Sequence, residues 1–134
     1  MPEVDVVDDT WIGVPAHLLG CIVGDPANWH VWWPELTVVV QERRGAKGMR
    51  WQVPSGRDGA VTGSMEIWLE PADDGTVVHY FARFSGARRP LRPRERVRLQ
   101  HEYRIRMKQV LFAMADRVDP GRIARLGGPP TGIP

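Results

Sequence analysis

The stretch DPANWHVWWPEL, residues 25–36, contains three of the six tryptophans of this 134-residue chain. Trp29 and Trp33 are four residues apart, so on a helix they share one face. Each indole buries a large apolar area, and we expect these two side chains to be structural and to close one end of a sheet. Trp32 lies at the edge of that face and is expected to meet either a ligand or solvent.

Short helices are predicted within and before this stretch. Pro15 suits a first helical turn and Gly24 a helix end, which predicts one helix between them. Asp25 is a good N-cap and Pro26 a good first residue for a second helix, which Pro34 ends.

The remaining segments up to about residue 85 alternate as β-strands do. In residues 3–12, Val4 and Val6 point to one face, and Val7 and Trp11 to the other. Turn signals with Gly and Asp separate the later segments, which predicts an antiparallel meander. These segments are ELTVVVQERR (35–44), GMRWQVPS (48–55), GAVTGSMEIWLEP (59–71) and GTVVHYFARFS (75–85).

A long helix is predicted from Arg94 to Val118, roughly 37 Å in length, so it must cross the whole sheet. Glu102 is expected to form ion pairs within the helix, with Arg98 and Arg106. Apolar side chains at i, i+3, i+4 and i+7 form one stripe: Leu99, Tyr103, Met107, Val110, Leu111, Met114 and Val118. The opposite, solvated face carries Arg94, Arg98, Arg104 and Lys108.

This order of elements is that of the helix-grip fold, an α+β architecture in which a curved antiparallel sheet wraps around a long C-terminal helix. The chain also resembles the START-like, birch-allergen-like superfamily called SRPBCC. The resemblance lies in TWIGVPAHLLGCIVGDPANWHVWWPEL, with its D-x-x-x-W-x-x-x-W-P pattern. GSMEIWLEP and DGTVVHYFARF look like the sheet of small actinobacterial members described as polyketide cyclase/dehydrase-like. The superfamily contains carriers, sensors and cyclases, so the resemblance implies a fold more than a reaction.

Length and composition predict one domain, residues 1–120, followed by a Gly/Pro-rich tail, residues 121–134. No apolar run is long enough for a transmembrane segment, and the start of the chain does not resemble a signal peptide, so a cytoplasmic protein is expected. Cys21 is the only cysteine, and the four histidines lack zinc-site spacing. We therefore expect no metal and no cofactor, and either a monomer or a homodimer.

Charge is distributed unevenly along the chain. Residues 1–74 hold 5 basic and 12 acidic side chains, whereas residues 75–134 hold 13 and 4. The arginine-rich run at 88–108 is expected to be the solvated face of the long helix. The alternative is a surface for phosphates or acidic membranes, with nucleic acid a less expected partner. Trp68, predicted to point outward, is a further candidate partner surface.

Polar candidates for a chemical site are few. By helical angle Arg96 falls within the apolar stripe, where it needs a carboxylate or an anionic ligand; otherwise it reaches solvent along its stem. Asp8 shares a face with Val4 and Val6, unless the register turns Asp9 inward instead or both lie at a solvated edge. His79 alternates with Tyr80, so only one of the two faces the helix, and His79 is the histidine with the best claim to acid/base chemistry.

Three functions remain open. The first is binding of a small apolar or amphipathic molecule, lipid-like or polyketide-like, between sheet and helix. The second is a cyclase/dehydrase-like enzyme using Asp8, His79, Arg96 or Tyr103. The third is an interaction protein that uses the basic helix face or Trp68. The predicted ligand-binding side chains are Trp32, Met49, Trp51, Met65, Ile67, Tyr80, Arg96, Tyr103, Met107 and Val110.

Overall fold

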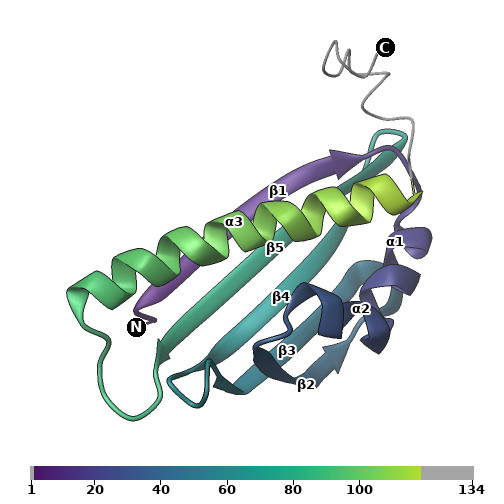
Figure 1. Cartoon of the computed structure of the whole chain (residues 1–134). Helices are drawn as coiled ribbons and strands as arrows, with labels where there is room; N and C mark the ends of the chain where they lie inside the picture. Colours follow the sequence, from purple (N-terminus) through teal and green to yellow (C-terminus); the bar gives the residue numbers. More distant parts are fainter. Residues whose placement is uncertain (1, 119–134) are drawn as a thin grey trace, which may run out of the picture.

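The computed structural model describes residues 2–118, so the predicted tail at 121–134 lies outside the described residues. Three helices, one 3-10 helix and five strands follow one another along this part of the chain (Figure 1). They are β1 (Val4–Ile12), α1 (Ala16–Val23), α2 (Pro26–Trp32), β2 (Leu36–Arg43), η1 (Gly45–Lys47), β3 (Gly48–Gly56), β4 (Val61–Ala72), β5 (Gly75–Gly86) and α3 (Pro93–Val118).

The five strands form one antiparallel sheet in the order β1-β5-β4-β3-β2. Strands β2 to β5 are the predicted meander, and β1 returns to pair with β5 along its whole length, from Val4 opposite Phe84 to Ile12 opposite Thr76. The long helix α3 crosses the concave face of the curved sheet, and α1 and α2 lie on that same face (Figure 1). The helix-grip architecture predicted from the sequence is confirmed. Within residues 2–118, no helix is both long and apolar enough to cross a membrane.

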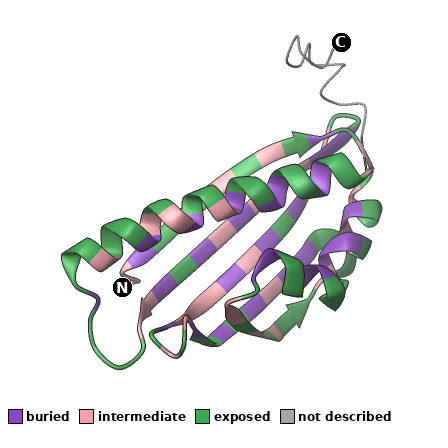
Figure 2. Cartoon of the chain, viewed as in Figure 1, coloured by how far each residue is buried: buried purple, intermediate pink, exposed green. Residues whose placement is uncertain are grey.

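Alternation along the strands separates a buried face from an exposed one (Figure 2). Val4 and Val6 are buried beneath α3, while Val7 and Trp11 are more than half exposed on the other side of the sheet. Trp68 also points outward, as predicted, and is 40% exposed. The sequence pattern therefore separated the two faces of the strands correctly and placed Trp68 on the outer one, but it left open which face of β1 and β5 lies beneath the helix.

The helix α3 is fastened to the edge strand β1 by polar contacts. The side-chain amide of Gln100 accepts from the Asp5 backbone N–H at 3.3 Å and donates to the Asp5 carbonyl at 2.9 Å. Lys108 Nζ lies 2.7 Å from Asp8 Oδ2. The two Gln100 hydrogen bonds occupy backbone groups of Asp5 that an edge strand otherwise leaves open for pairing with another chain. The apolar stripe of α3 is buried from Leu99 to Met114, as predicted.

The start of β3 depends on a glycine. Gly48 has a φ of +112°, and a Cβ added to it would lie 1.9 Å from the carbonyl oxygen of Ile67 on β4. Gly45, three residues earlier, has a φ of +58° but faces open space. Of these two glycines, only Gly48 combines a positive φ, which favours glycine, with a close approach of another strand.

Substitution of these two glycines by alanine is expected to have unequal effects. Gly45→Ala should lower the free energy of unfolding by about 1 kcal/mol, the cost of a left-handed alanine. Gly48→Ala should lower it by about 3 kcal/mol or more, because β3 and β4 must separate to admit the methyl group. Urea denaturation of both variants measures the difference; equal losses would contradict the packing described for β3.

Candidate functional site

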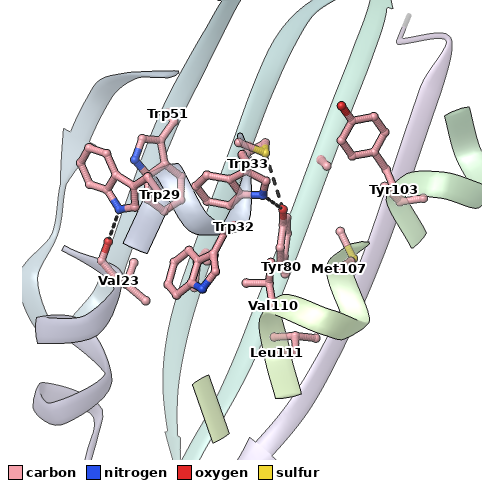
Figure 3. Packing of buried hydrophobic residues seen from close by; sticks show 14 of the residues in the cluster. Val23, Trp29, Trp32, Trp33, Trp51, Tyr80, Tyr103, Met107, Val110 and Leu111 are labelled. Atoms are coloured by element: carbon pink, nitrogen blue, oxygen red, sulfur yellow. Dashed lines mark hydrogen bonds between the residues drawn. The ribbon is translucent and has the colours of Figure 1, made fainter. Parts of the chain in front are cut away.

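The interior of the grip is organised around Trp33. Its indole N–H donates a 2.6 Å hydrogen bond to the hydroxyl of Tyr80 on β5, and both side chains are at most 1% exposed (Figure 3). The Tyr80 hydroxyl in turn lies 3.6 Å from the sulfur of Met65. Burial raises the pKa of Tyr80, so its hydroxyl stays protonated. Trp33 and Tyr80 therefore satisfy each other without a ligand.

The other interior tryptophans pack around Trp33 edge to face. Ring centroids lie 5.0 Å from Trp33 for Trp51 and 5.5 Å for Trp32. Trp29 packs on Trp51 at 5.5 Å and donates its indole N–H to the Val23 carbonyl at 2.7 Å. Trp29 and Trp33 are thus structural, as predicted. Trp32 is only 7% exposed, so it does not face solvent.

The side chains predicted to line a ligand cavity are themselves the core, with the exception of Arg96, which is exposed. They form one continuous apolar cluster in which each is at most 2% exposed, apart from Trp32. They are Trp32, Met49, Trp51, Met65, Ile67, Tyr80, Tyr103, Met107 and Val110. A molecule that entered between sheet and helix would have to displace these side chains.

Tyr103 on α3 differs from Tyr80 in one respect. It is 2% exposed, yet within residues 2–118 its hydroxyl oxygen has no hydrogen-bond partner (Figure 3). Its ring packs on Phe84 at 4.9 Å and receives the guanidinium of Arg57 at 5.6 Å from its centroid. Burial first, and then the negative charge of Glu35, raise the pKa of Tyr103, while Arg57, through its charge and its N–H groups near the hydroxyl oxygen, and the charge of Arg106 act in the opposite direction. The hydroxyl is a protonated donor without an acceptor.

Two ion pairs surround this ring. Arg106 donates to both carboxylate oxygens of Glu35, 2.9 Å from Oε2, and to the Trp32 carbonyl at 3.0 Å. Arg57 pairs with Glu102. The prediction that Glu102 pairs with Arg98 and Arg106 within α3 is therefore wrong, because both Glu102 and Arg106 are turned toward residues of other elements.

Arg57 reaches this position from the tight β3–β4 turn. Arg57 and Asp58 both have positive φ, 51° and 59°, followed by Gly59 at 86°. Left-handed backbone at a residue with a side chain costs of the order of 1 kcal/mol and is often found at functional positions. The turn and the loop from β5 to α3 lie at the same end of the sheet (Figure 1).

A cleft of about 480 Å³ opens between this turn, the start of β2 and the first turns of α3. A smaller hollow of about 200 Å³ adjoins it and shares Asp58, Ala60, Leu91 and Glu95. The cleft has both apolar and charged lining residues. Two of the charged ones, Glu35 and Arg57, also act on Tyr103: Arg57 packs on its ring, and the charges of both affect its hydroxyl. Its lining residues are Pro34, Glu35, Arg57, Asp58, Ala60, Val61, Leu91, Glu95, Arg98 and Leu99.

The predicted catalytic candidates are not brought together. Arg96 is exposed, and its Nε–H donates to the Glu3 carbonyl at 3.3 Å, because this part of α3 lies beside the residues before β1. The prediction from the helical angle that Arg96 lies in the interior is therefore wrong, and Arg96 takes the alternative position at the surface. Asp8 lies at the sheet edge with Lys108, and only Tyr103 of the four candidates is in the interior.

His79 lies on the outer face of the sheet. Its ring stacks on Trp68 with centroids 4.7 Å apart, and Nε2 lies 3.0 Å from Glu70 Oε1. Tyr80, the next residue, takes the inner face, so this choice between the two is settled. Among residues 2–118, no group of three or more His, Cys, Asp or Glu side chains could hold a metal ion.

Sequence reasoning did not identify Glu35 or Arg57 as parts of a site. Both lie in short connecting segments, and each finds its partner more than forty positions away. The one available signal for Arg57 was the turn sequence SGRDG, which places a cation in a tight turn.

The two buried tyrosines are expected to respond differently to removal of the hydroxyl. Tyr80→Phe leaves the buried Trp33 N–H without an acceptor and should cost about 1–3 kcal/mol of unfolding free energy. Tyr103→Phe removes a buried hydroxyl that has no partner, so stability should be unchanged or higher by up to about 1 kcal/mol. Urea denaturation distinguishes them, and a loss in Tyr103→Phe as large as that in Tyr80→Phe would contradict the assignment.

No protein-family model matches this chain, and no curated protein matches it either. Solved structures do match. A START superfamily protein from Mycobacterium smegmatis is 13% identical with a TM-score of 0.54, over 85% of this chain and 98% of that one. The Aha1 dimer from Colwellia psychrerythraea is 10% identical with a TM-score of 0.55, over 84% and 96%.

A third similar structure is the di-domain ARO/CYC protein BexL from the BE-7585A biosynthetic pathway. It is 15% identical with a TM-score of 0.55, and the match covers 88% of this chain and 47% of that one. At these identities the likeness concerns the fold and not the chemistry. Together with the observed order of strands and helices, it shows that the chain has the START-like helix-grip fold.

Proposed function

We propose that this protein binds a small amphipathic molecule in the cleft between the β3–β4 turn, the start of β2 and the first turns of α3. We call this end of the molecule the mouth of the grip. The observation that carries the proposal is the buried hydroxyl of Tyr103, which has no hydrogen-bond partner among residues 2–118 and belongs to a ring packed against Arg57, a residue of the cleft lining. A buried polar group without a partner costs free energy, and native structures seldom retain one without a water or ligand to satisfy it. A ligand oxygen that accepts from Tyr103 would supply the missing partner.

The lining of the cleft favours a ligand with two unlike ends. Val61, Leu91 and Leu99 offer an apolar wall, and all three are largely buried. Arg57 and Arg98 stand at the rim and suit a carbonyl, carboxylate or phosphate group. Pockets that bind small molecules typically combine an apolar lining with a few convergent polar groups, which is the pattern here.

Binding at the mouth requires less rearrangement than binding in the interior. The tryptophans around Trp33 are close-packed, and opening a space among them means loss of edge-to-face contacts and of the Trp33–Tyr80 hydrogen bond. The cleft already exists, and access from it to Tyr103 needs movement only of groups such as Arg57 and Leu99. This supports the mouth as the binding position.

A second candidate function is catalysis on a poly-carbonyl substrate. The observation that favours it is again Tyr103, whose raised pKa keeps it protonated and able to donate to a carbonyl or enolate oxygen. A base is also needed, and Glu35, the carboxylate whose charge acts on Tyr103, is engaged by Arg106. Ligand binding without chemistry therefore ranks first. Recovery of a chemically unchanged ligand after prolonged incubation favours it over catalysis.

The binding proposal predicts that a side chain filling the cleft blocks an amphipathic probe. Ala60 is exposed and lines the cleft, whereas Ala113 is exposed on the C-terminal half of α3. The anionic fluorophore 1-anilinonaphthalene-8-sulfonate should bind the wild type. Ala60→Trp should weaken binding at least tenfold, because the indole occupies the space of the probe, and Ala113→Trp should leave it unchanged.

Fluorescence titration measures both affinities, with thermal unfolding as a check that each variant is folded. Equal affinity in Ala60→Trp and wild type, or an equal loss in Ala113→Trp, would count against the cleft. Tyr103→Phe should weaken binding by about fivefold if the probe accepts a hydrogen bond from the hydroxyl.

A further inference from the structure

The outward face of α3 carries a second set of large apolar side chains, separate from the buried stripe. Val97 is 71% exposed and Ile105 47%. At 3.6 residues per turn these two positions fall within about a quarter of the helix circumference. In the described part of the chain this side of α3 is not covered by another element (Figure 2).

Arginines are interleaved with these apolar side chains. Arg94, Arg98 and Arg104 are exposed, and among residues 2–118 none of them forms an ion pair. Arg89, Arg106 and Lys108 are paired with Glu95, Glu35 and Asp8, whereas the exposed Arg92 and Arg96 form no ion pair among residues 2–118. Arg94, Arg98 and Arg104 lie on the same side of the helix as the exposed apolar residues.

Two open hollows flank this face and are rich in basic groups. One, of about 530 Å³, is bordered by Arg96, His101 and Arg104. The other, of about 620 Å³ at the start of α3, is bordered by Arg89, Arg92 and Arg94. Both are wide and shallow, which suits phosphate groups presented side by side on a surface more than a single enclosed ligand.

Exposed acidic residues also lie on the other side of the molecule. Asp5, Asp9 and Glu70 are on the outer face of the sheet, where Arg83 pairs with Asp5, whereas Arg94, Arg98 and Arg104 lie on α3. The chain is therefore electrically polar, in agreement with the excess of acidic residues before position 75 and of basic residues after it. An extended negative surface would attract the molecule with α3 foremost.

We propose that the outward face of α3 docks on the surface of an anionic lipid bilayer. Arg94, Arg98 and Arg104 would pair with lipid phosphates, while Val97 and Ile105 enter the boundary between headgroups and acyl chains. Clusters of basic residues beside exposed apolar side chains on a helix are the general signature of such interfacial binding. This proposal shares Arg98 with the cleft and otherwise depends on the surface of α3 alone.

The exposed apolar residues distinguish a bilayer from a nucleic acid. A phosphate backbone attracts arginine equally well, but it offers no apolar environment for Val97 or Ile105. On a bilayer both kinds of side chain contribute, so loss of either should weaken binding. On a nucleic acid only loss of the arginines should do so.

Vesicle co-sedimentation tests the proposal with the full chain. Wild type should bind vesicles of equimolar phosphatidylglycerol and phosphatidylcholine, should not bind phosphatidylcholine alone, and should dissociate as salt is raised. Arg94→Gln with Arg104→Gln should weaken binding about 25-fold, since each arginine near an anionic surface contributes roughly fivefold. Val97→Ser with Ile105→Ser should weaken it at least fivefold.

The matched control is Lys47→Gln with Arg83→Gln, which removes the same charge from exposed positions away from α3. This control should bind as wild type does. All four substituted positions of the test variants are exposed, so unfolding temperatures should stay near that of wild type. The control also separates a local effect from a change in net charge.

Three results would overturn the proposal. One is absence of binding to anionic vesicles. Another is an equal loss in the control and in Arg94→Gln with Arg104→Gln. The third is binding of a DNA or RNA duplex that outcompetes the vesicles and is insensitive to Val97→Ser with Ile105→Ser, which would assign the face to nucleic acid. Probe binding in the cleft should be unchanged in all these variants, so failure here leaves the cleft proposal separately testable.

Discussion

The hydrogen bond from the Trp33 indole to the Tyr80 hydroxyl joins the end of α2 to the middle of the sheet, and the rest of the interior is arranged around it. It satisfies two polar groups that are otherwise costly to bury, and it fixes the angle at which the indole enters the core. Trp51 and Trp32 then pack against the edges of that ring. A grip closed in this way is filled with its own aromatic side chains.

The interior is filled by apolar and aromatic side chains, so the charged residues of the candidate site lie at the mouth of the grip. Tyr103 marks the boundary: on one side its ring contacts Phe84 in the core, and on the other its hydroxyl is near charged residues that line the cleft. The two ion pairs, Glu35 with Arg106 and Arg57 with Glu102, join the turn, the start of β2 and α3. They hold the mouth in place while leaving Arg98 and the Tyr103 hydroxyl without partners among the described residues.

Periodicity predicted the architecture well, because burial repeats along strands and helices. The alternation of Val4, Val6 and Val7 separated the two faces of β1, and the 3.6-residue spacing from Leu99 to Met114 gave the buried face of α3. The same helical spacing offered Arg96 an interior position, but Arg96 is exposed. The helical angle gives the direction of a side chain, but it does not show where the sheet beneath the helix ends. Glu102 was misassigned because local i, i+4 pairing competes with partners that only the tertiary structure supplies.

The site was less predictable than the fold. Tyr103 was among the candidates, but neither Glu35 nor Arg57 was, as their partners are distant in sequence and their segments carry no periodic signal. The predicted cavity residues share a chemistry with core residues, because apolar and aromatic side chains serve both roles. No sequence pattern distinguishes a lined cavity from a filled one; packing decides it.

The central claim is that small molecules bind at the mouth while the tryptophan core stays closed. A two-dimensional ¹H–¹⁵N NMR titration with 1-anilinonaphthalene-8-sulfonate tests it most directly, since indole N–H signals report the core and backbone amides report the cleft. The account predicts that the amides of Ala60, Val61 and Leu99 shift first while the indole signals of Trp29 and Trp51 stay in place. Early, saturable shifts of the Trp51 indole and the Met65 amide would show that the probe enters the core and would contradict the account.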